Sequence, residues 1–182
     1  GGAGSGVDSR LMEVLEQAVE DGLVEDVVLA QSAAQREAFW TVRETIPEAN
    51  KRVGAISSHD ISIPIDTLPA FIADGQEALK QFGPVRLNSF GHLGDGNLHY
   101  NVFPPKGEKK ADWAHLKPDV MRVIHDLVHA YDGSISAEHG IGRLKAADLQ
   151  RYGDPAKLAV MRGIKLAIDP RGIMNPGAVI NV

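Results

Sequence analysis

The chain has 182 residues, of which 43% are hydrophobic and 24% charged, and its 24 acidic against 19 basic residues give a formal net charge of −5. This profile is typical of one globular domain. The absence of cysteine excludes disulfides, thiolate catalysis, Cys-type zinc sites and iron–sulfur clusters, so any metal would be bound through nitrogen and oxygen. The negative charge argues against a general nucleic-acid-binding protein, which needs a concentrated basic face.

The start of the chain shows no targeting signal. No apolar run approaches the roughly 20 residues that span a bilayer, and no charged-then-apolar signal peptide opens the sequence, so a cytoplasmic location is expected. Residues 1–6, Gly-Gly-Ala-Gly-Ser-Gly, read as a flexible linker or a cloning scar. The folded domain is therefore expected over residues 7–182.

The first part of the chain predicts two helices and a strand. Apolar residues recur at helical spacing over 8–21, and the segment 24–30 reads as a strand. Ser32 is expected to cap a helix that weakens at Pro47, since proline removes a backbone donor.

The middle of the chain predicts most of the sheet. Apolar and polar residues alternate over 58–65, which is the period of a half-buried strand, and Asp66 is expected to cap the helix that follows. Two further strands, 85–91 and 97–103, flank the turn Gly94-Asp95-Gly96 and form a predicted hairpin.

The last part predicts two more helices and one short strand. A long helix is expected from Asp112 to Tyr131, a strand over 133–137, and a helix that begins at Asp154-Pro155 and ends at Asp169-Pro170. In that last helix the apolar residues expected to face the core are Leu158, Met161, Ile164 and Ile168. Taken together, the elements predict an α+β fold, ferredoxin-like, with helices packed on a largely antiparallel sheet.

The densest polar constellation lies in the predicted hairpin, in the string FGHLGDGNLHYN. His92 ends one strand and His99 lies in the next, so the hairpin brings the two imidazoles close although seven positions separate them. Two imidazoles placed in this way supply two nitrogen ligands to a divalent metal. The alternative is a pair of structural histidines in a polar turn, and the spacing alone leaves both interpretations open.

A second constellation, SISAEHGIG, follows the predicted strand 133–137. Glu138 supplies an oxygen that would complete a His2Glu ligand set with an open position for substrate. His139 is a candidate proton-transfer group, because an imidazole titrates near neutral pH. The alternative, an exposed Glu-His dipeptide without a function, also stays open on spacing alone.

These two strings, together with DPRGIMNPGAV near the end of the chain, resemble the C-terminal domain of the FAD-linked oxidases. That family includes D-lactate dehydrogenases, the flavin subunit of glycolate oxidase and D-2-hydroxyglutarate dehydrogenase. The resemblance covers the chain from about Val24 onward. Three motifs in the same order are far more specific than any one of them.

The resemblance implies a role for each residue of these motifs. In metal-dependent members the residues that match His92, His99 and Glu138 bind a divalent ion, usually zinc or manganese. The residue that matches His139 acts as the base, and the one that matches Asn101 holds the substrate. The implied reaction is oxidation of a 2-hydroxy acid to a 2-oxo acid, with hydride transfer to the flavin.

Three further positions are interpreted through the same resemblance. Arg43 matches an arginine that clamps the substrate carboxylate, a contact for which the guanidinium fork is suited. Asn175 lies in a closing loop that comes near the flavin. Pro47 and Ser58 stand where the D-2-hydroxyglutarate enzymes are expected to have a threonine and a lysine, so a monocarboxylate such as lactate or glycolate becomes the favoured substrate.

The chain contains no flavin-binding fingerprint, so the resemblance implies a fragment of a longer flavoenzyme, with FAD bound mainly by a flavin domain absent from this sequence. Its partners would be the 2-hydroxy-acid substrate, that flavin domain and an electron acceptor of unknown identity. A homodimer and a peripheral position at the inner membrane stay open. The competing functions are a metallohydrolase and a non-catalytic module that binds metal or carboxylate.

Overall fold

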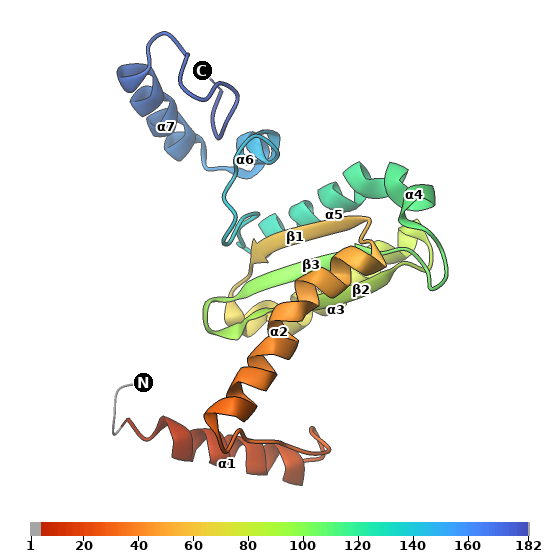
Figure 1. The fold of residues 1–182 in the computed structure, drawn as a ribbon. Helices are drawn as coiled ribbons and strands as arrows, with labels where there is room; N and C mark the ends of the chain where they lie inside the picture. Colours follow the sequence, from red (N-terminus) through yellow and green to blue (C-terminus); the bar gives the residue numbers. More distant parts are fainter. Residues whose placement is uncertain (1–4, 182) are drawn as a thin grey trace. The chain divides into compact units, whose positions relative to one another are not determined.

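The computed structural model describes residues 5–181, so the predicted linker 1–6 lies largely outside the described residues. Three strands and seven α-helices are assigned there, with short 3-10 turns between them (Figure 1). In chain order they are α1 (Val7–Glu20), α2 (Ala33–Val53), β1 (Ser57–Ser62), η1 (Ile65–Thr67), α3 (Leu68–Leu79), η2 (Lys80–Phe82), β2 (Arg86–His92), η3 (Leu93–Asp95), β3 (Asn97–Phe103), α4 (Lys110–Trp113), η4 (Ala114–Leu116), α5 (Lys117–Ala130), α6 (Ala146–Tyr152) and α7 (Pro155–Ile168).

The chain divides into two compact units, Gly1–Glu48 and Ala49–Val182. The first contains α1 and most of α2, and neither helix has a buried residue. The second contains the sheet and the remaining helices. In the part of the chain that the structure describes, no helix is long and apolar enough to cross a membrane.

The sheet has the strand order β1-β3-β2, and both of its ladders are antiparallel. With α3 between β1 and β2, and α5 after β3, this is the βαββα part of a ferredoxin-like arrangement. The expected α+β class is therefore confirmed. The place of a fourth strand beside β1 is taken by an isolated antiparallel bridge between Ser62 and Ser134.

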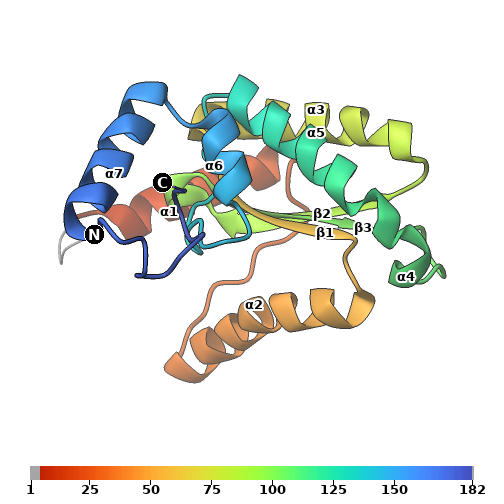
Figure 2. The ribbon, with the colours of Figure 1, turned by 90° about the horizontal axis from the view of Figure 1, so that it is seen from above.

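The hydrophobic core lies between one face of the sheet and the helices α3 and α5, which lie on the same side of it (Figure 2). Tyr100 on β3 is fully buried against Phe71 of α3, with the ring centroids 5.5 Å apart. A Cβ at Gly75 of α3 would lie 2.2 Å from the Tyr100 hydroxyl, so only glycine lets the helix approach the sheet here. The core residues are Ile61, Ile63, Leu68, Phe71, Leu79, Leu98, Tyr100, Val102, Val120, Ile124, Val128 and Ile135.

Several predicted elements are confirmed with small shifts. The helix predicted over 8–21 is α1, and the hairpin strands predicted at 85–91 and 97–103 are β2 and β3. Asp154 caps α7, because its side chain accepts a hydrogen bond from the Lys157 backbone N–H at 2.8 Å.

Two of the predicted strands are wrong. Residues 24–30 form no strand, and over 133–137 only the bridge at Ser134 has strand pairing. An apolar run becomes a strand only where a second strand offers its backbone groups. In the described chain 24–30 meets no such strand, and 133–137 is held by other bonds that are described below.

The helix predictions also need correction. Asp66 does not cap α3, because it lies within the 3-10 turn η1 and the N-cap position is Thr67, whose side chain makes no capping hydrogen bond. Helix α2 continues through Pro47, since proline breaks only the bond to the preceding turn. The helix predicted from Asp112 is split before Lys117, where Pro118 occupies the first turn of α5.

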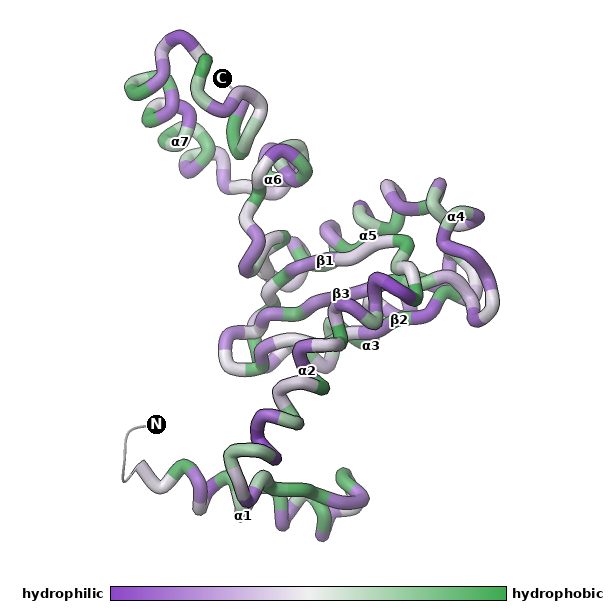
Figure 3. Tube along the Cα trace, viewed as in Figure 1, coloured by the Kyte–Doolittle hydropathy of each residue, from purple (hydrophilic) through white to green (hydrophobic). Residues whose placement is uncertain are grey.

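The face expected to be buried on α7 is only partly buried. Its hydrophobic positions are visible in green in Figure 3, yet Leu158 is its only buried residue in the described structure. Ile164 and Ile168 are 56% and 69% exposed. Helical spacing identifies an apolar face, but it does not identify what covers it.

Candidate active site

The candidate site lies on the face of the sheet opposite to the core. Successive side chains on a strand alternate between the two faces, so Asp60 of β1 and Phe90 of β2 share a face with His99 of β3, with which both are paired. The core face carries the apolar residues of the core together with Ser57, His59 and Ser89, whereas this second face carries mostly polar side chains. They are Ser58, Asp60, Ser62, Arg86, Asn88, His92, Asn97, His99 and Asn101.

The hairpin brings the two predicted ligand histidines together. His92 is the last residue of β2 and pairs with Asn97, which places it diagonally across from His99. The two imidazole centroids are 6.4 Å apart. The turn requires Gly96, whose φ of +71° and ideal Cβ position 2.0 Å from the Ile63 carbonyl oxygen leave no space for a side chain.

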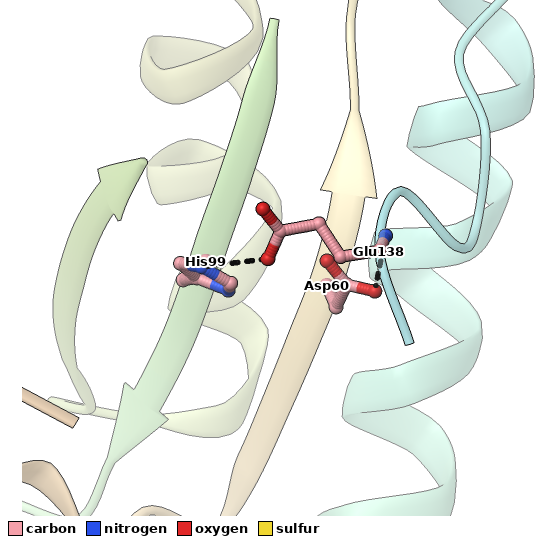
Figure 4. Close-up of side chains that lie close together, drawn as sticks. All are labelled: Asp60, His99 and Glu138. Carbon is pink, nitrogen blue, oxygen red and sulfur yellow. Dashed lines mark hydrogen bonds and ion pairs between the residues drawn. The ribbon is translucent and has the colours of Figure 1, made fainter. Parts of the chain in front are cut away.

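Glu138 reaches both histidines from a different part of the chain. Its Oε1 lies 3.0 Å from His92 Nδ1, and its Oε2 lies 3.6 Å from His99 Nε2. Figure 4 shows the Glu138 carboxylate directed toward the His99 ring. The two imidazoles and the carboxylate predicted as ligands therefore meet at one place.

His139 lies beside this group and is largely exposed. Its ring stacks on that of His99, with centroids 6.1 Å apart and an interplanar angle of 29°. Its Nδ1 is 3.9 Å from Asp60 Oδ2, and its side chain is 71% exposed. The imidazole is thus held next to the cluster of His92, His99 and Glu138, while its other side is exposed.

The prediction from sequence missed Asp60, which is 5% exposed at the centre of the site. Its Oδ2 accepts the backbone N–H groups of Glu138 and His139, at 3.0 and 2.8 Å, and its Oδ1 accepts from Asn97 Nδ2 at 3.1 Å. Burial raises the pKa of Asp60, but these two backbone donors, with His139 and Lys145 nearby, bring the net pKa below its usual value. Asp60 is therefore an ionised carboxylate at neutral pH.

The tightest potential metal set differs from the predicted one. Ligand atoms of Asp60, His99 and Glu138 all lie within 4.8 Å of one another (Figure 4). His92 contacts the other oxygen of Glu138 instead. The sequence signal for Asp60 was the alternation of residues 58–65, which placed it opposite to the core but did not give its strand partner.

The other predicted site residues, Asn101, Asn175 and Arg43, lie in three different parts of the chain. Asn101 is 6% exposed, and its amide donates to the backbone oxygens of His99 and Asn88, at 3.2 and 3.5 Å. Asn175 has a left-handed φ of 47° and accepts a bond from Arg143 at 3.4 Å. Arg43 lies on α2 in the unit Gly1–Glu48, whereas the histidine cluster lies in the other unit.

Comparison with known proteins identifies one family. A family model described as FAD linked oxidases, C-terminal domain, matches residues 2–179. A protein of Xanthomonas citri pv. viticola named D-2-hydroxyglutarate dehydrogenase is 39% identical over 171 residues, which cover 93% of this chain and 36% of that protein. The mitochondrial D-2-hydroxyglutarate dehydrogenases of Arabidopsis thaliana and Bos taurus are each 36% identical and are covered to 29% and 31% of their length. The chain thus spans about a third of the length of these relatives.

Proposed function

Since this chain belongs to the family of FAD-linked oxidase C-terminal domains, we propose that it forms the substrate- and metal-binding part of an FAD-dependent 2-hydroxy-acid dehydrogenase. The relatives carry names of such enzymes, and they are about three times as long as this chain. The observation that carries the proposal is the meeting of two imidazoles and a carboxylate beside an exposed imidazole. A flavin domain outside this sequence would bind most of the FAD.

The donor set of the site fits a divalent cation. His92, His99 and Glu138 offer two nitrogens and a carboxylate, which suit zinc or manganese and leave a position for substrate. A bound cation would lower the pKa of the substrate hydroxyl, and FAD would accept the hydride. The two oxygens of the Glu138 carboxylate each face one of the two rings, at 3.0 and 3.6 Å from the nearest imidazole nitrogen.

His139 is the proposed base. It would take the proton from the substrate hydroxyl while the hydrogen on the same carbon leaves with its electron pair for the flavin, so that a C=O bond forms. Its ring is exposed on one side and stacked on His99 on the other, and this geometry limits its rotation without closing access to it. A positioned general base contributes about 10²–10⁴-fold to the rate.

Three residues are proposed to orient the substrate and the flavin. Arg43 would clamp the substrate carboxylate through its guanidinium fork. Asn101 would contact the substrate through its amide oxygen, because its nitrogen donates to backbone carbonyls. Asn175 would lie near the flavin.

The tail of the substrate has two candidates. The names of the relatives favour D-2-hydroxyglutarate, which has a second carboxylate. The position of Ser58 favours a monocarboxylate such as D-lactate or glycolate, because this exposed serine on the site face of β1 has no charge to offer a distal carboxylate. The proposal also includes an electron acceptor of unknown identity that reoxidises the flavin, a homodimeric assembly and a cytoplasmic location.

The test uses the complete flavoprotein and a panel of 2-hydroxy acids, with bleaching of the flavin absorbance as the measurement. We expect bleaching by a D-2-hydroxy acid, and the relative rates with D-lactate, glycolate and D-2-hydroxyglutarate identify the tail. A preparation that cannot be reconstituted with FAD would contradict the proposal. Ester or amide hydrolysis that a chelator abolishes would favour a metallohydrolase, and metal binding without either activity would favour a non-catalytic module.

Variants separate the proposed roles. His92→Ala and Glu138→Ala should each lose bound metal, measured by elemental analysis, while His139→Ala should keep the metal and slow flavin reduction by about 10²–10⁴-fold. His115→Ala, an exposed histidine on η4, serves as the control and should change neither quantity. Equal metal content in the wild type and both ligand variants would refute the ligand assignment.

A further inference from the structure

We propose that Asp60 is the positioning residue of this site, and that it holds Glu138 and His139 in the orientation the reaction requires; this rests on the function proposed above. Asp60 does not itself bind substrate or metal in this proposal. It acts through the backbone of the two residues that do.

The hydrogen bonds of Asp60 converge on the Glu138-His139 peptide. One oxygen, Oδ2, accepts both backbone N–H groups, at 3.0 and 2.8 Å, and these bonds set the direction in which each side chain leaves the backbone. The other oxygen accepts from Asn97 Nδ2 at 3.1 Å, which fixes the carboxylate in turn. Bonds from a buried carboxylate to backbone N–H groups are charge-assisted and therefore strong.

The loop that carries Glu138 has few other attachments to the sheet. Among residues 5–181, its only strand-type pairing is the bridge of Ser134 with Ser62. Beyond it, Ala137 N–H donates to the backbone oxygen of Asp60 at 3.2 Å, and Lys145 Nζ lies 3.4 Å from the same oxygen. Asp60 thus holds the loop through both its main chain and its side chain.

The bonding of Asp60 assigns it to positioning rather than to metal coordination. Its Oδ2 already accepts two N–H groups and its Oδ1 accepts a third donor, whereas the Glu138 carboxylate faces the imidazole nitrogens of His92 and His99. Residues that orient ligands in this way affect metal affinity by about 10–100-fold when they are replaced.

The experiment compares Asp60→Ala with Asp60→Asn. The first measurement is the affinity of the chain for Zn²⁺ or Mn²⁺ by calorimetry, and Asp60→Ala should weaken it by about 10–100-fold. Asp60→Asn should recover most of the affinity, because its amide oxygen still accepts both N–H groups. The side-chain nitrogen that this substitution introduces would face the side-chain amide of Asn97. The Oδ1 of Asn97 is buried without a partner in the described structure, and rotation of the Asn97 amide would let this oxygen accept a hydrogen bond from the introduced nitrogen.

The second measurement does not depend on metal. Hydrogen exchange followed by NMR should show the backbone amides of Glu138 and His139 exchanging at least about tenfold faster in Asp60→Ala, because each loses a charged acceptor, and near the wild-type rate in Asp60→Asn. If the wild type binds neither cation, the proposed metal site fails while this readout still decides the role of Asp60. Unchanged exchange of these two amides in Asp60→Ala would overturn it.

Asp169→Ala is the matched control. Asp169 is also a buried carboxylate that accepts two backbone N–H groups, those of Ile173 and Met174, in a different loop. Its loss should destabilise the chain but leave metal affinity and the exchange of the Glu138 and His139 amides unchanged. A loss of affinity equal to that of Asp60→Ala would show a general effect of destabilisation and would overturn the assignment.

Discussion

Two buried histidines lie on the core side of the sheet, away from the candidate site. His59 Nε2 lies 2.9 Å from Ser57 Oγ, and His59 Nδ1 lies 3.2 Å from His125 Nε2. His125 Nδ1 faces Asp148 at 3.3 Å. All three contacts can be made with both rings neutral: Ser57 donates to His59 Nε2, His59 Nδ1–H donates to His125 Nε2, and His125 Nδ1–H faces Asp148. The arrangement is therefore suited to two uncharged imidazoles.

The surroundings of both rings disfavour the charged form. Burial, followed by His125, Lys145 and Lys117, lowers the pKa of His59 to about 3. Burial also lowers the pKa of His125, although Asp148 and Asp126 oppose the shift. In the unfolded chain both rings titrate near the ordinary value of about 6.5.

Stability should therefore decrease on mild acidification. Below about pH 6.5 the unfolded chain binds protons that the folded chain does not, so the free energy of unfolding falls, by about 1.4 kcal/mol per pH unit for His59 and in the same direction for His125. For His59 this continues down to about pH 3. Urea unfolding at pH 7.5 and pH 5.0 measures this decrease in the free energy of unfolding. Both pH values lie above the range in which most exposed carboxylates titrate. His115→Gln should keep the slope, and equal midpoints at the two pH values would contradict the expectation.

At the scale of elements, the β2–β3 hairpin is the part on which the site depends most. It carries His92 and His99. Its turn contains two glycines, and the space available for a side chain differs between them. A Cβ at Gly96 would lie 2.0 Å from the Ile63 oxygen with φ at +71°, whereas a Cβ at Gly94 meets no atom within 4 Å. The two positions therefore form a matched pair.

Gly96→Ala should lower the free energy of unfolding by about 1–3 kcal/mol from the backbone conformation, with a further loss from the clash. Gly94→Ala should change it little, and thermal unfolding compares the two. Because the clash would displace the start of β3, the strand that carries His99, Gly96→Ala should also weaken metal binding. Equal stability of the two variants would show that position 96 does not require glycine.

The sequence predicted those elements whose signals are local. Both hairpin strands follow from alternation and turn residues, and α7 begins at Asp154-Pro155 as expected. Prediction from the sequence failed where the structure or role of a residue depends on a partner far along the chain. Residues 24–30 have strand composition without a strand beside them, and Asp60 acquires its role only through pairing with His99 and contact with a loop far along the chain.

At the scale of the whole molecule, the two units differ in how they are stabilised. The unit Ala49–Val182 has a core in which Ile61, Tyr100 and Ile124 are fully buried. In the described part of the unit Gly1–Glu48, the helices carry exposed apolar residues such as Val14 and Val42, at 65% and 67%. Helical stability in water comes mainly from packing of an apolar face.

Backbone amides should therefore exchange with solvent in two groups. Those of α1 and of α2 up to Glu48 should exchange through local opening, well before those of β1, β3 and α5, which should require global unfolding. Hydrogen exchange with mass spectrometry on the intact chain measures this. Equal protection of the two groups would show that α1 and α2 are buried in solution.

The single bridge that replaces a fourth strand has a consequence for self-association. An open strand edge invites pairing with another chain, and natural sheets commonly block such an edge with a lysine. Lys145 occupies this place, where its ammonium group donates to the Ile135 oxygen at 2.7 Å and reaches the Asp60 oxygen at 3.4 Å. Burial lowers its pKa, and Asp60 and Asp148 oppose the shift. The loop that carries Glu138 and His139 thereby also occupies backbone groups of Asp60 and Ser62 on the outer edge of β1, which are then not offered to a strand of another chain.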